Sequence, residues 1–355
     1  MGMPVYWAVK GVIMSFNFIQ ELASPEEIMA LMPLSEKGAK IKKDRDLIIK
    51  HIFEGKDNRF ILIIGPCSAD NEEAVLDYLK RLALIQEEVK DKIIIIPRIY
   101  TNKPRTTGEG YKGMVHQPDA NKKSDMKKGI LAIRQLHIKA IEETGLTCAD
   151  EMLYPENYDY LKDILAYVAV GARSVENQQH RLTISGLDIP AGMKNPTSGD
   201  PAVMLNAIRA GQIEHTFIYR GHEVETSGNP LTHAILRGYM DQYGRNFPNY
   251  HYEDVKHVID QYNKRGLECP AIIIDLNHAN SNKHFAEQPR IAYEVLRNRN
   301  YDLTHKKMVK GFMVESYIEE GSQTIGGGVY GKSITDPCLG WPASEDMIHE
   351  IYKRL

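Results

Sequence analysis

The chain has 355 residues, of which 43% are hydrophobic and 26% charged, and its formal net charge is −3. This balance is typical of a globular enzyme and gives no basis for binding nucleic acid or a membrane surface. No apolar run approaches the ~20 residues that a membrane-spanning helix needs. The four cysteines are widely spaced, without a C-x-x-C pair, which favours a reducing cytoplasm over a disulfide framework.

An arm of mixed helical and polar character, residues 1–53, precedes the first strand-like run. We expect residues 54–355 to form the catalytic domain. Lys10 interrupts the apolar opening and no small-residue cleavage site follows it, so no secretory signal is predicted. Met14 is an alternative start for the natural chain.

Short apolar runs then recur along the chain and predict eight strands. They are Arg59–Ser68, Lys92–Tyr100, Cys148–Leu153, Tyr167–Arg173, Asp188–Lys194, Thr216–Gly221, Ala271–His278 and Lys310–Ser316. Runs as continuous as Ile93–Ile96 suit strands that are buried on both faces of a parallel sheet.

Helical patterns separate these runs. They cover Asn71–Lys90, Lys128–Thr144, Asp254–Arg265, Ala286–Asn298 and Ser344–Leu355. Alternating strands and helices predict an α/β fold, a (β/α)8 TIM barrel, with a doubly wound sheet as the alternative. The strand-poor stretch Tyr219–Tyr252, which contains the run Ile235–Tyr239, is expected to be an inserted excursion after strand six.

Chemically useful side chains collect where the predicted strands end, which is where barrel enzymes place their catalytic groups. Cys67 lies at the end of strand one, His278 at the end of strand seven and Glu315 at the end of strand eight, and Asp336 lies in the next loop. In a closed barrel these strands are neighbours. The four side chains would form a mixed sulfur, nitrogen and oxygen site for Mn²⁺, Fe²⁺, Co²⁺ or Zn²⁺. Alternatively, Cys67 is a small buried hydrophobe and the carboxylates are solvated.

Six cations are expected at the same mouth of the barrel. They are Arg98, Lys103, Arg105, Arg173, Lys194 and Arg237. Such a cluster repels itself unless anions neutralise it, and Arg and Lys bind phosphate and carboxylate well. The pattern therefore predicts one or two substrates with several negative charges, and Glu151 could hold a cation or a water among them. Surface salt bridges explain a single member of the group better than all six.

The strings G-P-C-S, K-P-R-T-T, G-A-R, H-A-N-S, V-E-S and Y-G-K-S-I-T-D follow one another between Arg59 and Asp336. Together they resemble the class I (alpha-type) 3-deoxy-D-arabino-heptulosonate-7-phosphate (DAHP) synthases. The resemblance implies a metal-dependent transferase that condenses phosphoenolpyruvate with erythrose 4-phosphate and water, releasing phosphate, as the first step of the shikimate pathway. It also implies a homo-oligomer, dimer or tetramer, and commonly feedback inhibition by an aromatic amino acid.

The family's residues carry over by position. Its metal ligands fall on Cys67, His278, Glu315 and Asp336. Its phosphoenolpyruvate contacts fall on Arg98, Lys103, Glu151, Arg173, Lys194 and Arg237. The phosphate of erythrose 4-phosphate falls near Arg105 and Thr106. The implied catalytic group is Lys103, as general acid, together with the ligands Cys67 and His278.

This chain departs from the family strings at a few positions. Asn277 stands before His278 where relatives have serine, Pro196 interrupts the string that begins at Lys194, and the segment between Arg237 and His278 looks long. By analogy, the N-terminal arm and the region Arg173–Leu187 would be regulatory, or would make plain oligomer contacts.

Two other functions remain as alternatives. A sister enzyme would use arabinose 5-phosphate, against which the K-P-R-T-T string argues. A non-catalytic anion-binding barrel would not need the intact set of metal ligands.

Cys338 lies two residues beyond Asp336, so we expect its sulfur to lie near that of Cys67. Without metal, Arg98 and Lys103 should lower the pKa of a partly exposed Cys67. Oxidation should then form a Cys67–Cys338 disulfide.

Overall fold

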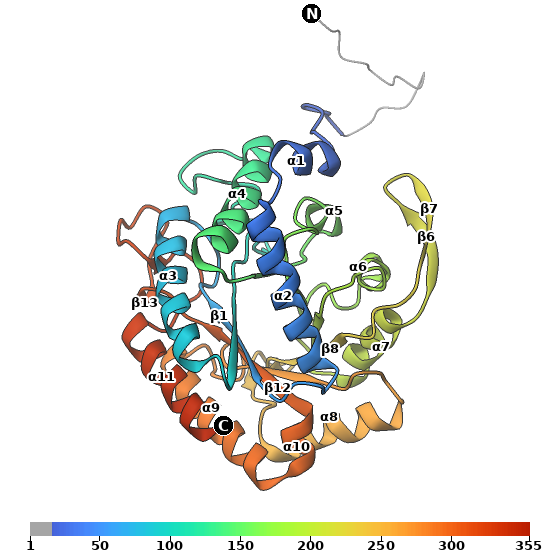
Figure 1. The fold of residues 1–355 in the computed structure, drawn as a ribbon, viewed down its shortest axis with the longest axis vertical. Coiled ribbons are helices and arrows are strands. Elements are labelled where there is room, and N and C mark those ends of the chain that lie inside the picture. Colours follow the sequence, from blue (N-terminus) through green and yellow to red (C-terminus); the bar gives the residue numbers. More distant parts are fainter. Residues whose placement is uncertain (1–15) are drawn as a thin grey trace, which may run out of the picture.

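The computed structural model describes residues 16–355, and its core is one sheet of parallel strands (Figure 1). The sheet strands are β1 (Phe60–Gly65), β2 (Ile93–Pro97), β3 (Ala149–Glu151), β4 (Tyr167–Val170), β5 (Ala191–Lys194), β8 (Thr232–Leu236), β11 (Ile272–Asp275) and β12 (Val309–Glu315). Their order is β2-β1-β12-β11-β8-β5-β4-β3. A parallel bridge between Arg98 and Ala149 joins the two end strands. The predicted (β/α)8 barrel is therefore confirmed over the doubly wound sheet.

The predicted sixth strand was wrong. Thr216–Gly221 overlaps β6 (His215–Tyr219), which pairs antiparallel with β7 (His222–Thr226) in a separate hairpin that extends from the barrel (Figure 1). Every residue of β6 is partly or fully exposed, whereas every residue of β8 is buried. The insertion thus precedes the sixth barrel strand, and a smaller hairpin, β9 (Tyr239–Met240) with β10 (Asn246–Phe247), follows it.

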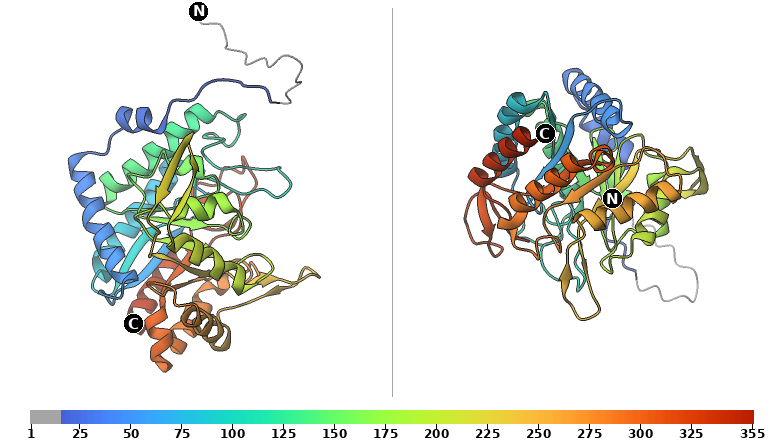
Figure 2. Two further views of the ribbon diagram at one scale, coloured as in Figure 1. Left: turned by 90° about the vertical axis from the view of Figure 1, so that its right-hand side faces the viewer. Right: turned by 90° about the horizontal axis from the view of Figure 1, so that it is seen from below.

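The helices lie around the outside of the strands (Figure 2). They are α3 (Glu72–Val89), α4 (Met126–Thr144), α5 (Pro155–Tyr158), α6 (Gln178–Ile184), α7 (Pro201–Gln212), α8 (Tyr252–Lys264), α9 (Gln288–Tyr301), α10 (Leu303–Met308) and α11 (Trp341–Arg354), with a 3-10 turn η1 (Phe285–Glu287) before α9. All five predicted helices are present. α4 ends as expected at Thr144. It is followed by Gly145, whose φ of 71° is the left-handed conformation that glycine adopts freely.

Alternation along the strands builds two layers of core. In β1, Ile61 and Ile63 belong to the cluster that fills the barrel, whereas Leu62 and Ile64 belong to the cluster beneath the helices. Successive side chains of a strand point to opposite faces, so an unbroken apolar run is buried on both sides.

The described part of the arm holds α1 (Pro25–Leu31) and α2 (Glu36–Phe53). The last turn of α2 puts Ile49, Ile52 and Phe53 into the cluster inside the barrel, and the Phe53 ring lies 4.3 Å from that of His233. The arm thus fills one end of the barrel, although the boundary at residue 53 stays a prediction. The alternative start at Met14 lies outside the described residues. Among the helices of residues 16–355, none is both long enough and apolar enough to cross a membrane.

Candidate active site

The ends of β1 and β12, together with the loop that holds Asp336, bring three of the four predicted metal ligands together, and His278 lies beside them. Gly65 of β1 is in register with Glu315 of β12, and Cys67 follows two residues later. One donor atom from each of Cys67, Glu315 and Asp336 fits within 4.8 Å of the other two. His278 Nε2 lies 3.9 Å from Glu315 Oε1. The predicted convergence is therefore present for Cys67, Glu315 and Asp336, and His278 approaches Glu315. Ligation itself stays a prediction.

Gly65 is required where β1 meets β2. A Cβ atom at this position would lie 2.3 Å from the carbonyl oxygen of Arg98, closer than real Cβ contacts. The absence of a side chain lets the two backbones approach, which brings the Cys67 turn against Arg98 and Lys103.

A cation already lies among the sulfur and carboxylate groups. Lys103 Nζ is 2.6 Å from Cys67 Sγ and 3.1 Å from Asp336 Oδ2. Burial opposes the charge of Lys103, but the anionic forms of Cys67 and Asp336 raise its pKa above the ordinary value. Burial favours protonated Asp336, yet Lys103 and His278 hold the pKa of that carboxyl well below its usual range. The sulfur of Cys67 and the carboxylate of Asp336 are therefore stabilised by a neighbouring positive charge.

One expectation about Cys67 was wrong. The side chain is fully buried, and burial raises the pKa of its thiol to about 11, with Glu315 adding to the rise. Lys103 and Arg98 lower that pKa, as expected, but they do not outweigh burial. The expected proximity of the sulfurs is supported, because the backbone N of Cys67 donates to Cys338 Sγ at 3.4 Å.

Asp275, which was not predicted from the sequence, orients His278. It accepts from His278 Nδ1 at 3.0 Å and pairs with Lys194 Nζ at 3.2 Å. Burial opposes the charge of Asp275, but His278 and Lys194 hold its pKa far below the ordinary value. His278 has φ of 53°, an uncommon conformation for a non-glycine residue. The signal was a carboxylate at the C-terminal end of an otherwise apolar strand.

Glu315 is held from two sides. Arg98 donates to Glu315 Oε1 at 2.9 Å, and Asn277 donates to Glu315 Oε2 at 2.6 Å. Arg98 also donates to Pro66 O and stacks over the Tyr100 ring at 3.8 Å. The departure from the family string at Asn277 thus supplies a direct partner for a predicted metal ligand.

A cavity of about 300 Å³ opens beside this cluster. Its lining includes all the predicted substrate residues, namely Arg98, Lys103, Arg105, Thr106, Glu151, Arg173, Lys194 and Arg237, together with His278 and Asp336. Lys283, Glu109 and Thr197 also line it and were not predicted from the sequence. Cys67 and Glu315 are buried and are not among its lining residues.

Several cations of the cavity lack an acidic partner. Within the described residues, Arg105, Arg173, Arg237 and Lys283 form no ion pair with a carboxylate, unlike Lys103 and Lys194. Burial lowers the pKa of Arg237, and the nearby Arg173 lowers it further, although Asp275 opposes this. The site is therefore built to receive anions.

A (β/α)8 barrel with these two features, a mixed sulfur, imidazole and carboxylate cluster and a pocket of unpaired cations, defines an enzyme that acts on anionic substrates. Comparison with known proteins gives the family. A model of the DAHP synthetase I family matches residues 33–349. The chain belongs to this family, and it is an enzyme of the transferase class.

Named relatives cover nearly the whole chain. The Tyr-sensitive phospho-2-dehydro-3-deoxyheptonate aldolase of Salmonella typhimurium is 36% identical, over 95% of this chain and 94% of its own length. The Phe-sensitive enzyme of Escherichia coli is 36% identical over 94% of each chain. The phenylalanine-inhibited enzyme of Saccharomyces cerevisiae is 38% identical over 96% of this chain and 91% of its own. A solved structure of the Francisella tularensis aldolase has a TM-score of 0.87 and 29% identity, covering 95% of this chain and 98% of that one.

Proposed function

We propose that this chain is a DAHP synthase, which condenses phosphoenolpyruvate with erythrose 4-phosphate and water and releases phosphate. The observation that carries this proposal is the set of unpaired cations, Arg105, Arg173, Arg237 and Lys283, around a cavity that adjoins the Cys67 cluster. Two phosphates and one carboxylate would neutralise that charge. The relatives named above support the same reaction.

Cys67, His278, Glu315 and Asp336 would hold a divalent metal. Their chemistry fits Mn²⁺, Fe²⁺, Co²⁺ or Zn²⁺ better than an ion that prefers only oxygen. The position of Lys103 Nζ against Cys67 Sγ and Asp336 Oδ2 supports the need for a cation there. When bound, such a metal supplies a Lewis acid for the aldehyde oxygen of the aldose.

Phosphoenolpyruvate would lie on Lys103, Arg173, Lys194 and Arg237. Lys194 is buried and pairs with Asp275, so its position is fixed before substrate arrives. Arg173 and Arg237, which form no ion pair with a carboxylate in residues 16–355, would pair with the phosphate and carboxylate. Arg98 contributes to the same wall while its guanidinium stays bonded to Glu315.

Erythrose 4-phosphate would put its phosphate on Arg105 and Thr106, above phosphoenolpyruvate. Arg105 is anchored for this role, because its Nε donates to the carbonyl of Tyr111 at 2.8 Å. Holding two polyanions in register supplies much of the catalysis, since such positioning can contribute ~7–11 kcal/mol.

In the condensation, C3 of phosphoenolpyruvate forms a bond to the aldehyde carbon. Lys103 Nζ would donate a proton to the aldehyde oxygen as that bond forms. Water adds at C2 and phosphate leaves. Glu151, on the cavity wall, would hold that water.

Phosphate release with phosphoenolpyruvate, Mn²⁺ and each aldose tests the proposal. Release with erythrose 4-phosphate supports DAHP synthesis. Release only with arabinose 5-phosphate would assign the sister activity, and release with neither would indicate an anion-binding barrel.

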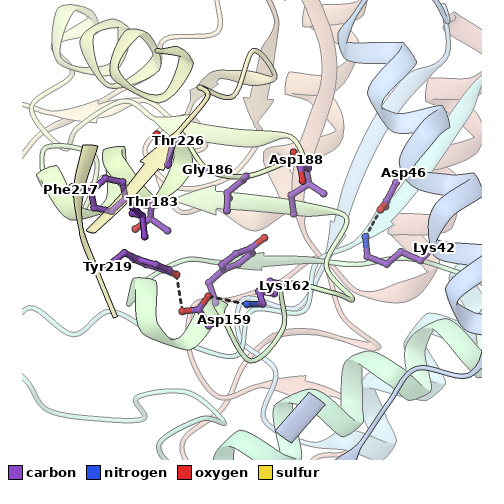
Figure 3. Close-up of a pocket in the computed structure, with 14 residues that line it drawn as sticks. Lys42, Asp46, Asp159, Lys162, Thr183, Gly186, Asp188, Phe217, Tyr219 and Thr226 are labelled. Carbon is purple, nitrogen blue, oxygen red and sulfur yellow. Dashed lines mark hydrogen bonds and ion pairs between the residues drawn. The ribbon is translucent and has the colours of Figure 1, made fainter. Parts of the chain in front are cut away.

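We also propose that an aromatic amino acid inhibits the enzyme from a second cavity of about 500 Å³ (Figure 3). Phe217, Tyr219 and Tyr158 line it, and Lys42 and Lys162 stand among Asp46, Asp159 and Asp188. An aromatic ring with an ammonium and a carboxylate would fit these partners. The relatives' names, Tyr-sensitive, Phe-sensitive and phenylalanine-inhibited, support regulation of this kind. Calorimetric titration with each of the three aromatic amino acids tests binding.

A homo-oligomer is the third part of the proposal. Phe16, Phe18 and Ile19 of the arm are each more than 80% exposed, and Ile218 of the β6–β7 hairpin is 77% exposed. A second copy could cover these apolar groups. Light scattering at several concentrations would distinguish monomer, dimer and tetramer. The cytoplasmic location stays a prediction, with which the four unpaired cysteines agree.

A further inference from the structure

The barrel closes at a seam between β2 and β3, beside the catalytic cavity. Within the described chain, one backbone bridge, Arg98 with Ala149, joins these strands, and Ile99 N donates to Ala149 O at 2.9 Å. The other neighbouring barrel strands share three to five residue pairs each. The seam therefore has little backbone pairing of its own.

Beyond the last backbone bridge, the side-chain carboxylate of Asp150 connects the two sides of the seam by hydrogen bonds. Its Oδ1 accepts from Thr101 N at 2.9 Å and from Glu151 N at 2.7 Å, and its Oδ2 accepts from the Thr101 hydroxyl. Asp150 is 4% exposed and Thr101 is fully buried. Charge-assisted bonds of this kind are strong, so Asp150 binds Thr101 firmly to the end of β3.

A histidine from the outer layer faces the same carboxylate. His137 of α4 is buried, and its Nε2 lies 3.6 Å from Asp150 Oδ2. In the described part of the chain, Asp150 pairs with no lysine or arginine within 4.0 Å. The hydrogen bonds that Asp150 accepts therefore come from residues at the seam, and it forms no ion pair with a lysine or arginine of the described chain.

Thr101 also anchors the loop formed by residues 102–114, which carries two of the proposed substrate contacts. Its carbonyl accepts from Val115 N at 3.2 Å, and inside the loop Lys103 N donates to Lys112 O at 3.0 Å. The segment 102–114 therefore leaves from Thr101 and returns to it. This segment carries Lys103 and Arg105, while Glu151 follows Asp150 on the opposite side of the seam.

We propose that Asp150, acting through Thr101, is a positioning residue that fixes the loop of Lys103 and Arg105 relative to Glu151. This inference rests on the proposed function of the cavity. Arg173, Lys194 and Arg237 lie at the ends of β4, β5 and β8. The seam therefore does not place these three phosphoenolpyruvate contacts, although it does place Lys103. Loosening it should disturb the aldose and the proton donor more than phosphoenolpyruvate.

Steady-state kinetics of Thr101→Val and Asp150→Ala test the proposal, with Thr147→Val as the matched control. Thr147 is also fully buried, but it precedes β3 and its hydroxyl accepts from Arg45 Nε at 3.2 Å, away from the cavity. Both test variants should lose about ten- to a hundred-fold in kcat and raise the KM for erythrose 4-phosphate, because small displacements of catalytic groups cost that much. The KM for phosphoenolpyruvate should rise less than the KM for erythrose 4-phosphate, because Arg173, Lys194 and Arg237 keep their positions. Asp150→Asn should recover part of the loss, because its amide oxygen can still accept from Thr101 N.

Hydrogen exchange tests the same seam without substrate. In Asp150→Ala the amides of Thr101 and Val115 should exchange about tenfold faster or more than in wild type, and in Thr147→Val they should not. If Asp150→Ala does not fold, the same hydrogen-exchange measurement on Thr101→Val tests the role of the seam. If the wild-type enzyme were inactive with both aldoses, the proposed function would be rejected. The hydrogen-exchange measurement would still test whether Asp150 holds the seam together. Wild-type exchange in the test variants, or an equal rise in KM for both substrates, would overturn the inference.

Discussion

Asp275 bonds His278 and thereby joins the two halves of the candidate site. The carboxylate accepts from His278 Nδ1, which leaves Nε2 directed toward Glu315, and it pairs with Lys194 on the substrate side. One buried group therefore orients a proposed metal ligand and a proposed phosphoenolpyruvate contact. Removing the hydrogen-bond partner of a metal-ligating histidine typically lowers the metal affinity about 10- to 100-fold.

Asp275→Asn should weaken metal binding by about 10- to 100-fold and raise the KM for phosphoenolpyruvate. The reason is that both His278 and Lys194 lose a charged partner. Metal titration followed by steady-state kinetics measures the two effects. Asp260→Asn, which removes a surface carboxylate paired with Lys256, is the control. Unchanged metal affinity in Asp275→Asn would rule out the orienting role.

Cys67→Ala should abolish bound metal and activity together while leaving the fold intact, because the barrel core does not depend on one thiol. Metal analysis, activity and circular dichroism report the three properties. Cys148→Ala is the matched control, since Cys148 is equally buried but lies before β3, away from the cluster. Near wild-type activity in Cys67→Ala would contradict the assignment.

Lys194→Ala and Arg105→Ala should separate the two substrates. The first should raise the KM for phosphoenolpyruvate and lower kcat, and the second should mainly raise the KM for erythrose 4-phosphate. Loss of a buried charged contact costs about 2–5 kcal/mol, so the Lys194 variant should be the more damaged, because Asp275 loses a partner. Equal effects on both substrates would show that the two-site partition is wrong.

The fold and the cluster could be predicted because they depend on local pattern and strand order. Continuous apolar runs such as Ile93–Ile96 indicated buried parallel strands, and the position of Glu315 at a strand end followed from barrel geometry. The sixth strand was misassigned because β6 has a strand-like composition. Only three-dimensional pairing shows that its partner is β7 rather than the sheet.

Other errors concerned environment rather than position. The sequence shows that Cys67 is followed along the chain by cations, but it does not show that the thiol is completely buried. Burial is the larger influence on the thiol pKa. Asp275 and Asn277 were missed as supporting groups for the same reason, because side-chain partners depend on the exact approach of separate strands.

In air, the metal-free enzyme should lose activity slowly by forming a Cys67–Cys338 disulfide, with oxygen as the oxidant. The two residues are in contact, since Cys67 N donates to Cys338 Sγ. The reaction should be slow because burial raises the pKa of both thiols, and thiolate is the reactive form. Thiol plus Mn²⁺ should restore activity. Peptide mapping detects the bond, and a Cys338→Ser variant that inactivates as fast as wild type would exclude it.

His233 should make stability depend on pH. It is fully buried inside the barrel, where its Nε2 lies 2.7 Å from the Tyr167 hydroxyl and its Nδ1 lies 2.8 Å from the carbonyl of Leu231. Because Nδ1–H donates to that carbonyl, Nε2 is the acceptor for Tyr167, and the ring is neutral. Burial lowers the pKa of His233 to about 4, whereas an unfolded histidine titrates near ~6.5.

Between these two values the unfolded chain binds the proton and the folded chain does not. The stabilisation is therefore complete above about pH 6.5 and is lost as the pH falls toward 4, by up to about 1.4 kcal/mol per pH unit. His233→Gln lacks this titration, so its free energy of unfolding should fall less steeply as the pH falls. The difference in free energy of unfolding between wild type and this variant should therefore become smaller at low pH. Urea denaturation from pH 7.5 to 5, at fixed protein concentration, measures the trend. His222→Gln, on the exposed β7 strand, should keep the wild-type slope, and a constant gap between wild type and His233→Gln would contradict the prediction.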